Sequence, residues 1–509
     1  MQTNVLEYLE NTVYKVPNKI AFADDKMQIT FRKFYDECRA IGSYLAGENV
    51  YKEPVIIFMD KSPNTLTAFF GTIYGGNYYV PIDEEMPSRR IELILENTKA
   101  RYLICDNNNL EKAKELGIDG QILLFDEIVN TPIDTNKLDS IRSKALDVDP
   151  IYVLFTSGST GVPKGVVGYH RGVIDYIENL SEVLDFNENT VFGNQAPLYF
   201  DACMKEVYPT MKYGATTYLI PKQYFMFPIK LVEFMNEKQI NTVCWVVSAL
   251  TMISSFGTFE TIEPKYLHTI AFGSEVFPIK QFNIWKNQLP DATFTNLYGP
   301  TEATGMSCYY RVNRDFELDE VIPIGRPFQN TQIILINDGK EASKGEVGEI
   351  CIRGTCLTLG YYNNNEKTSE VFVQNPLNPY YNDLIYKTGD LGKYNEEGEL
   401  IFVSRKDYQI KHMGHRIELG EIDANVAMED RVKQSCTIYV KESGKIVLFY
   451  VGDITKKEIS TFLKEKLPRY MIPNAIIQLE SLPLTPNGKM NRIEMEQIYI
   501  NTKINKEKK

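Results

Sequence analysis

The chain has 509 residues, of which 43% are hydrophobic and 24% charged. This balance is typical of an ordinary soluble globular protein, and the length predicts two or more domains. The formal net charge of −12 argues against a nucleic-acid partner, because nucleic-acid binders normally present a basic face. The eight cysteines are scattered without a CxxC pair, which favours reduced, buried thiols in a cytoplasmic protein over disulfides or a zinc site.

The N-terminal segment shows no targeting or membrane signal. Its first residues are acidic and polar where a signal peptide needs an apolar stretch. The longest apolar run, residues 66–82, is interrupted by two glycines and an asparagine and is too short to span a bilayer. We therefore expect no membrane partner, and we predict a buried helix that runs into a turn.

Through most of the chain, short apolar runs of strand type alternate with helical segments. One such helical segment is 229–238. This alternation predicts an α/β architecture. The expected buried strands are 151–155, 241–247, 268–272 and 331–336.

The pattern changes toward the C-terminus. A strand-like segment at 399–403 leads into SRKD, a stretch with glycines, and a helix that starts near Glu418. A last helix is expected at about 455–466, ending before Pro468, and the Lys-rich tail is expected to be disordered. We predict a large N-terminal α/β domain, residues 1–406, and a small mobile C-terminal α+β domain, residues 407–509.

The strongest local signal is LFTSGSTGVPKGV at 154–166. Glycines let the backbone approach a ligand closely, successive N–H groups can form an anion nest, and hydroxyls and a lysine add further donors. The lysine follows a proline and the GK[ST] ending is missing, so this is not a Walker A loop. The loop directly follows a buried strand, which favours a polyphosphate site over a flexible linker.

Five motifs together resemble the adenylate-forming superfamily, which includes acyl-CoA synthetases, luciferases and the adenylation domains of nonribosomal peptide synthetases. They occur in the order expected for that superfamily: TSGSTGVPKG in the loop above, NLYGPTE at 296–302, YKTGD at 386–390, SRKDYQIKHMGHRIELGEID at 404–423 and LTPNGKM at 484–490. The segment GGNYYVPID at 75–83 also matches. The resemblance implies the superfamily's acyl-adenylate-forming fold, with ATP and Mg²⁺ as cofactors.

The resemblance also implies how ATP is held. Glu302 would be the magnesium ligand, because a hard cation prefers carboxylate and phosphate oxygens. Tyr298 would stack on adenine and Asn296 would bind its edge, while Asp390 would accept hydrogen bonds from the ribose hydroxyls and Arg405 would pair with ribose or phosphate. The β- and γ-phosphates would be held by Thr156, Ser157, Thr160 and Lys164, and Gly299, Pro300 and Thr301 complete the nucleotide-binding motif.

Two positions carry the catalytic cycle that the resemblance implies. Lys489 corresponds to the catalytic lysine, whose charge would bridge the attacking carboxylate and the α-phosphate. Asp407 falls at the hinge about which the small domain would turn between adenylation and thiol attack.

The segment LYFDACMKE at 198–206 favours an α-amino acid as the acid. Asp201 matches the aspartate that pairs with the substrate ammonium in amino-acid-activating members. Phe272 stands where a smaller residue is frequent and should shorten the pocket. Lys205 stands where an apolar residue is frequent; it either pairs with an acidic or polar substrate side chain, or packs its stem while the ammonium reaches water. The rest of the expected pocket wall is Ala202, Ala249, Ile270, Leu297, Gly305 and Met306.

The sequence thus predicts an enzyme that converts an amino acid to its aminoacyl-adenylate and passes it to a thiol. Only twenty residues follow Lys489, so a stand-alone enzyme similar to D-alanine–carrier protein ligases is expected, with a separate acyl or peptidyl carrier protein as acceptor. The alternatives are an acyl- or aryl-CoA ligase, which shares the ATP motifs, and a non-enzymatic scaffold. A hydrolase is disfavoured because there is no GxSxG elbow.

Overall fold

The computed structural model describes residues 2–158, 162–484 and 490–507, with side chains up to 503. Its contacts divide the chain into two compact units. Unit 1 comprises residues 1–84, 97–154 and 165–406, and unit 2 comprises 85–96, 155–164 and 407–509. Among the described residues, no helix has the length and apolar character needed to cross a membrane.

Unit 1 is built around a nine-stranded sheet with the order β15-β14-β13-β12-β11-β9-β10-β1-β2. Its six central strands, from β13 to β1, run parallel, and antiparallel pairs close both edges. The strands are β1 (Ile20–Ala23), β2 (Gln28–Thr30), β9 (Val191–Asn194), β10 (Thr216–Leu219), β11 (Thr242–Val246), β12 (Thr269–Gly273), β13 (Thr293–Tyr298), β14 (Cys308–Arg311) and β15 (Arg326–Pro327).

A second sheet has the order β6-β5-β3-β4-β7-β8, in which the strands from β6 to β7 pair in parallel. Its strands are β3 (Pro54–Phe58), β4 (Tyr78–Pro81), β5 (Tyr102–Cys105), β6 (Gln121–Leu124), β7 (Pro150–Thr156) and β8 (Lys164–Tyr169). β3, β4 and β5 are buried along their whole length, because a parallel sheet covered on both faces reads as continuous apolar runs.

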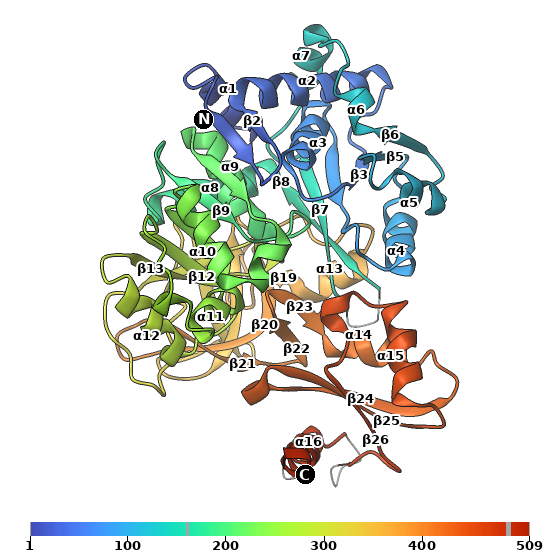
Figure 1. Cartoon of the computed structure of the whole chain (residues 1–509), viewed down its shortest axis with the longest axis vertical. Coiled ribbons are helices and arrows are strands. Elements are labelled where there is room, and N and C mark those ends of the chain that lie inside the picture. Colours follow the sequence, from blue (N-terminus) through green and yellow to red (C-terminus); the bar gives the residue numbers. More distant parts are fainter. Residues whose placement is uncertain (1, 159–161, 485–489, 508–509) are drawn as a thin grey trace. The chain divides into compact units, whose positions relative to one another are not determined.

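Helices between these strands cover the two sheets. Helices α1, α2 and α3 pack together at the top of the view in Figure 1. The helices of this region are α1 (Leu6–Val13), α2 (Phe31–Gly47), α3 (Pro63–Tyr74), α5 (Leu110–Glu115), α6 (Phe125–Ile128), α7 (Thr135–Arg142), α8 (His170–Val183), α9 (Met204–Tyr213), α10 (Pro228–Glu237), α11 (Val247–Ser255) and α12 (Ile279–Gln288), with 3₁₀ turns η1 (Asp201–Cys203), η2 (Lys222–Met226), η3 (Thr258–Glu260) and η4 (Thr301–Ala303).

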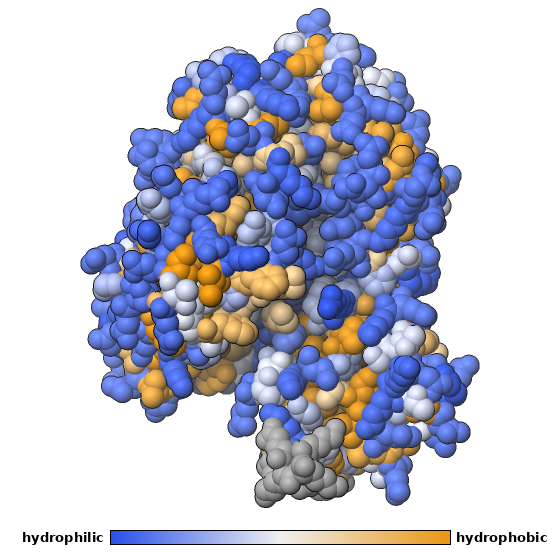
Figure 2. Space-filling model, in the orientation of Figure 1, coloured by the Kyte–Doolittle hydropathy of each residue, from blue (hydrophilic) through white to orange (hydrophobic). Residues whose placement is uncertain are grey.

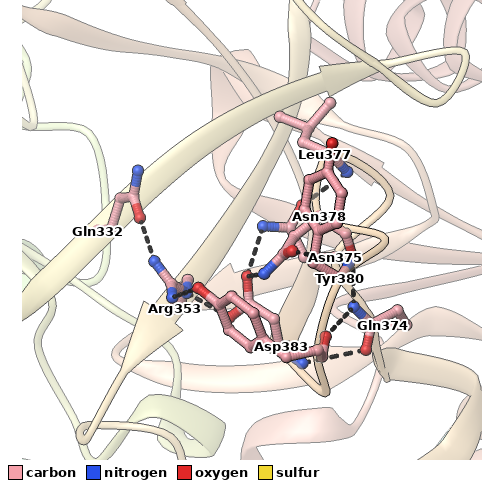
Figure 3. Close-up of polar contacts among 9 residues, drawn as sticks. Gln332, Arg353, Gln374, Asn375, Leu377, Asn378, Tyr380 and Asp383 are labelled. Atoms are coloured by element: carbon pink, nitrogen blue, oxygen red, sulfur yellow. Dashed lines mark hydrogen bonds and ion pairs between the residues drawn. The ribbon is translucent and has the colours of Figure 1, made fainter.

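The remainder of unit 1 is an antiparallel sheet with the order β17-β16-β18-β20-β19, in which β21 pairs with β20. The elements are β16 (Thr331–Asn337), β17 (Lys340–Glu341), β18 (Gly348–Gly354), α13 (Asn365–Val371), β19 (Phe372–Gln374), β20 (Leu384–Tyr394) and β21 (Leu400–Arg405). Asp383 organises the loop before β20: its carboxylate pairs with Arg353 and accepts hydrogen bonds from Asn375 and Asn378, each at 3.0 Å (Figure 3). These contacts lie directly before the first residue of β20, Leu384.

Unit 2 contains α4 (Ser88–Thr98) and the elements after residue 407. They are β22 (Gln409–His412), β23 (His415–Glu418), α14 (Leu419–Val426), β24 (Val432–Val440), η5 (Lys441–Ser443), β25 (Lys445–Gly452), α15 (Lys456–Lys464), η6 (Arg469–Met471), β26 (Ala475–Gln478) and α16 (Arg492–Glu507). Helices pack on the sheet β24-β25-β26. The predicted fold class is confirmed, and the predicted strands and helices lie within two residues of β7, β11, β12, β16, β21, α10, α14 and α15.

The prediction for the C-terminal tail was wrong. Residues 455–466 are not the last helix, because α16 follows and occupies much of the tail that was expected to be disordered. Met495 and Tyr499 lie one helical turn apart and pack with Cys436, Ile438 and Leu482. Two buried side chains at this spacing stabilise the helix. The charged residues around them weaken the apolar pattern, so the sequence did not predict it.

The burial of the cysteines and the distribution of apolar side chains on the surface agree with what the composition predicts for a globular protein. All eight cysteines are free and buried, as predicted. Figure 2 shows a largely hydrophilic face on which hydrophobic side chains gather in small separate groups. Among the exposed apolar residues are Met226, Phe227 and Ile229, around the start of α10.

Candidate functional site

Two residues expected to hold adenosine, Asn296 and Tyr298, lie at the end of β13 in unit 1. The Asn296 amide nitrogen donates to the carbonyl of Pro323 at 2.9 Å, which fixes the amide plane. Tyr298 is buried and its hydroxyl donates to an Asp390 oxygen at 2.6 Å. Burial and the adjacent carboxylate raise the pKa of Tyr298 well above its ordinary value, so the phenol stays protonated and remains a donor.

Asp390 lies on β20 opposite Arg405 on β21. Its second oxygen accepts from the Arg405 guanidinium at 2.6 Å, so the carboxylate is held from two sides by a phenol and a guanidinium. A carboxylate offers about four lone-pair positions, so such an anchored group can still accept from two hydroxyls. Arg405, which was expected to reach ribose or phosphate, here pairs with Asp390.

Glu302 lies in η4, directly after β13, and is fully buried. Its carboxylate accepts from the Tyr361 hydroxyl at 2.7 Å, and its backbone carbonyl accepts from both the amide and the hydroxyl of Thr358 at 3.0 Å. A buried carboxylate held in this way suits Mg²⁺, which takes one or two carboxylates and completes its shell with phosphate and water. Among the described residues no group of three or more His, Cys, Asp or Glu could hold a metal.

The turn NLYGPTE depends on close backbone approach. A Cβ on Gly299 would lie 2.4 Å from the Gly305 carbonyl oxygen, so only glycine fits there. Gly305 has φ +94°, and a Cβ there would meet the Tyr176 ring at 3.3 Å. Pro300 and Thr301 are half-buried within the same turn. This turn therefore brings Glu302 and Gly305 into one neighbourhood with Tyr176 of α8.

Asp201 begins the turn that leads into α9 and is half-buried. Burial raises the pKa of the Tyr152 and Tyr176 hydroxyls, and the negative charge of Asp201 raises both further. The negative charge of Asp201 therefore acts on two buried hydroxyls of unit 1.

Phe272 is buried and paired in register with Asn296 of β13. Its ring packs against Phe277 and Phe282, with ring centroids 5.0 and 6.1 Å apart. This packing holds the bulky side chain at the carboxyl end of β12, where ligands bind in open α/β sheets. Lys205 is buried, with only 3% of the residue exposed.

The phosphate loop belongs to unit 2. Thr156 ends β7 and its hydroxyl donates to the Lys164 carbonyl at 3.4 Å, while the Ser157 hydroxyl donates to the Arg416 carbonyl at 2.8 Å. The Lys164 ammonium lies 3.8 Å from the Glu418 carboxylate. A Cβ on Gly158 would lie 2.0 Å from a backbone carbonyl oxygen, which explains the glycine. Thr160 lies outside the described residues.

The last two site residues predicted from the sequence are Lys489 and Asp407. Lys489 lies outside the described residues. Asp407 is exposed and its carboxylate accepts from the Gln409 amide at 3.1 Å. It is the first residue of the final stretch of unit 2, directly after Lys406 of unit 1.

Three side chains that contact the site were not predicted from the sequence. Tyr361 holds Glu302, and Arg90 pairs with Glu421, whose other oxygen accepts from the Gly158 amide at 3.2 Å. Glu421 lies within the recognised motif at 404–423 but carried no expected role. Tyr361 and Arg90 have no local signal that separates them from ordinary surface residues.

Comparison with known proteins establishes the family. Residues 9–362 match the model of the AMP-binding enzymes, so the chain belongs to this family of adenylate-forming enzymes, which use ATP and Mg²⁺. Bacitracin synthase 1 of Bacillus licheniformis is 30% identical over 96% of this chain. The chain spans 9% of that protein and between 8 and 44% of the curated relatives it matches.

Solved structures share the fold. The Vibrio cholerae adenylation domain AlmE, in complex with glycyl-adenosine-5'-phosphate, has a TM-score of 0.84 at 20% identity, covering 98% of both chains. The o-succinylbenzoate CoA synthetase of Bacillus subtilis has a TM-score of 0.81 at 19% identity, covering 97% of this chain and 98% of that one. Both the amino-acid and the CoA-ligase branches are therefore represented among the structural neighbours.

Proposed function

We propose that this enzyme activates an α-amino acid as its aminoacyl-adenylate and transfers it to the phosphopantetheine thiol of a separate carrier protein. The observation that supports the amino-acid assignment is Asp201, a half-buried carboxylate at the start of the turn into α9, within the segment LYFDACMKE. Similarity to peptide synthetases supports the same branch.

In the first half-reaction the amino-acid carboxylate attacks the α-phosphorus of ATP, the α–β phosphoanhydride bond breaks, and pyrophosphate leaves. Asp390, anchored by Tyr298 and Arg405, would accept the ribose hydroxyls and orient the nucleotide. Glu302, held by Tyr361, would bind Mg²⁺, which supplies charge neutralisation at the phosphates. Lys489 would lie between the two reacting anions and lower their repulsion.

Thr156, Ser157, Thr160 and Lys164 would bind the β- and γ-phosphates, with Asn296 at the adenine edge. In the second half-reaction a thiol attacks the acyl carbon, the bond to AMP breaks, and AMP leaves. Asp201 would pair with the substrate ammonium throughout. In a partly dry pocket an analogue without the amine leaves this carboxylate unpaired, at a cost of about 3–5 kcal/mol.

The test is amino-acid-dependent exchange of labelled pyrophosphate into ATP, with the proteinogenic amino acids, D-alanine and deaminated acids as substrates. We expect the wild-type enzyme to catalyse exchange with an amino acid. The exchange rate should fall by at least about 100-fold in Asp201→Asn and should be lost in Lys489→Ala. Lys464→Ala, at an exposed lysine, is the control and should keep the wild-type rate. Exchange with a plain acid but with no amino acid would instead assign the enzyme to the acyl- or aryl-CoA ligases.

A further inference from the structure

Glu418, the last residue of β23, is contacted by two side chains from different segments of unit 2. One of its carboxylate oxygens, Oε1, accepts a hydrogen bond from the side-chain amide of Gln409. The same oxygen lies 3.8 Å from the Lys164 ammonium. Gln409 is only 5% exposed and Glu418 only 8%. Gln409 and Lys164 therefore share one buried acceptor.

The β22–β23 hairpin explains why Gln409 and Glu418 meet. The two residues are paired directly across the antiparallel ladder, and residues paired in this way have Cβ atoms about 4.5–5.5 Å apart on the same face of the sheet. The backbone amide of Gln409 also donates to the Asp407 carboxylate at 3.1 Å. The Gln409 side chain is thus fixed at both ends, by its strand and by the carboxylate that it binds.

Lys164 belongs to unit 2 and is the first residue of β8, at the end of the loop in which phosphate is expected. Its carbonyl accepts from the Thr156 hydroxyl at 3.4 Å. The Ser157 hydroxyl of the same loop donates to the carbonyl of Arg416 on β23 at 2.8 Å. The loop thus contacts β23 at Arg416 and, through Lys164, at Glu418. The position of the Glu418 carboxylate therefore acts directly on the phosphate loop.

The distance between Lys164 and Glu418 is that of an electrostatic contact, not of a hydrogen bond. A hydrogen bond between an ammonium and a carboxylate has a heavy-atom distance of about 2.7–2.9 Å. At 3.8 Å the ammonium is attracted to Glu418 without donating to Oε1, which already accepts from Gln409. A closed ion pair would commit one of the three ammonium donors to Glu418 and remove it from phosphate. Gln409 holds the carboxylate back from closing.

We infer that Gln409 is a positioning residue for ATP, which restrains the Glu418 carboxylate and so keeps the Lys164 ammonium available to the β- and γ-phosphates. This inference rests on the proposed function, in which Lys164 binds these phosphates. Gln409 needs no contact with the nucleotide, because it acts through Glu418. The charge of Glu418 competes with phosphate for Lys164, and Gln409 limits that competition. The two residues therefore have opposite effects on the affinity for ATP.

The test compares the binding of MgATP and of AMP to the full chain by isothermal titration calorimetry, without an acid substrate. AMP lacks the two phosphates that Lys164 would bind. Gln409→Met keeps the length of the side chain but removes its donor, and should raise the Kd for MgATP about tenfold because the ion pair can close. Glu418→Gln removes the competing charge and should lower the Kd for MgATP about threefold. The double variant should behave as Glu418→Gln alone, and the Kd for AMP should be unchanged in all three.

Gln434→Met and Glu465→Gln, at exposed positions of unit 2, are the matched controls and should keep both affinities. A merely structural role of Gln409 would weaken the binding of MgATP and AMP alike, and would persist in the double variant. Either of these results, or an unchanged Kd for MgATP in Gln409→Met, would refute the inference. An unchanged Kd for MgATP in Lys164→Ala would instead refute the proposed phosphate site on which the inference rests.

Discussion

His170, the first residue of α8, is held neutral by its surroundings. It is 4% exposed, and the backbone amide of Val5 donates to its Nδ1 at 3.3 Å, which requires an unprotonated nitrogen. Burial lowers the pKa of His170 from its ordinary value of 6.5 to about 3. The residue lies close in sequence to the phosphate loop, but these contacts assign it a structural role in joining the N-terminus to α8.

The depressed pKa predicts a pH-dependent stability of unit 1. Between pH 6.5 and about 3 the unfolded chain binds a proton at this position and the folded chain does not. The stabilisation is therefore fully present above pH 6.5 and is lost as the pH falls, by up to about 1.4 kcal/mol per pH unit. Urea unfolding followed by tryptophan fluorescence reports it, because both tryptophans, Trp245 and Trp285, are buried in unit 1.

The unfolding free energy of the wild-type protein is compared with that of His170→Gln across this pH range. His268→Gln, at an exposed histidine, is the control. The difference in unfolding free energy between wild type and His170→Gln should be constant above pH 6.5 and shrink below it. A difference that does not change between pH 7.5 and 5 would contradict the prediction.

At the scale of elements, one buried ion pair joins three separate segments of unit 2. Arg90 of α4 pairs with Glu421 of α14, and the other Glu421 oxygen accepts from the Gly158 amide after β7. Both side chains are almost completely buried. Burial raises the pKa of Glu421, and the Arg90 charge counters this rise. A carboxylate thus occupies an amide of the loop in which phosphate is expected, and it ties that loop to two helices.

Glu421→Gln should loosen these three segments together, because it leaves the Arg90 charge buried without a counter-charge, a loss of about 3–5 kcal/mol. Hydrogen exchange measured by mass spectrometry should show faster exchange in peptides from α4 and α14. Glu465→Gln, at the exposed end of α15, should leave both unchanged. Unaltered exchange in α4 would show that the pair does not hold the segment.

For the whole molecule, the last passage of the chain from unit 1 to unit 2 falls between Lys406 and Asp407. Lys406 is anchored in unit 1, where its amide donates to the Gly389 carbonyl at 2.8 Å and its ammonium lies 3.0 Å from Glu349. Asp407 interacts with Gln409 of unit 2. We propose that Asp407 absorbs the backbone rotation between the two half-reactions, since hinges are residues at the ends of elements that need not touch substrate.

Asp407→Pro should separate the half-reactions, because proline fixes φ near −65° and restricts the preceding residue. We expect pyrophosphate exchange within about threefold of wild type and thioester formation on pantetheine reduced by about 100-fold or more. Asp407→Ala, which keeps backbone freedom, should retain both activities. Equal loss of both half-reactions in Asp407→Pro would rule out the hinge role.

The sequence alone determined the family, the α/β class and the position of five strands, because buried strands are continuous apolar runs and the phosphate loop has a distinctive glycine and hydroxyl pattern. It missed α16, whose two anchoring side chains are outnumbered by charges. The side chains that contact the motif residues could not be predicted either, because they are distant in sequence. Tyr361 follows Glu302 by 59 positions and Glu421 follows Arg90 by 331.

Only the tertiary structure decided how the charges are shared. In the sequence, Lys205 could equally have extended to solvent. Packing buries it, with only 3% of the residue exposed. Burial and pairing depend on segments that are distant along the chain, so composition and spacing cannot supply them. The motifs therefore define the reaction class, whereas only the folded chain shows which charged side chains are buried.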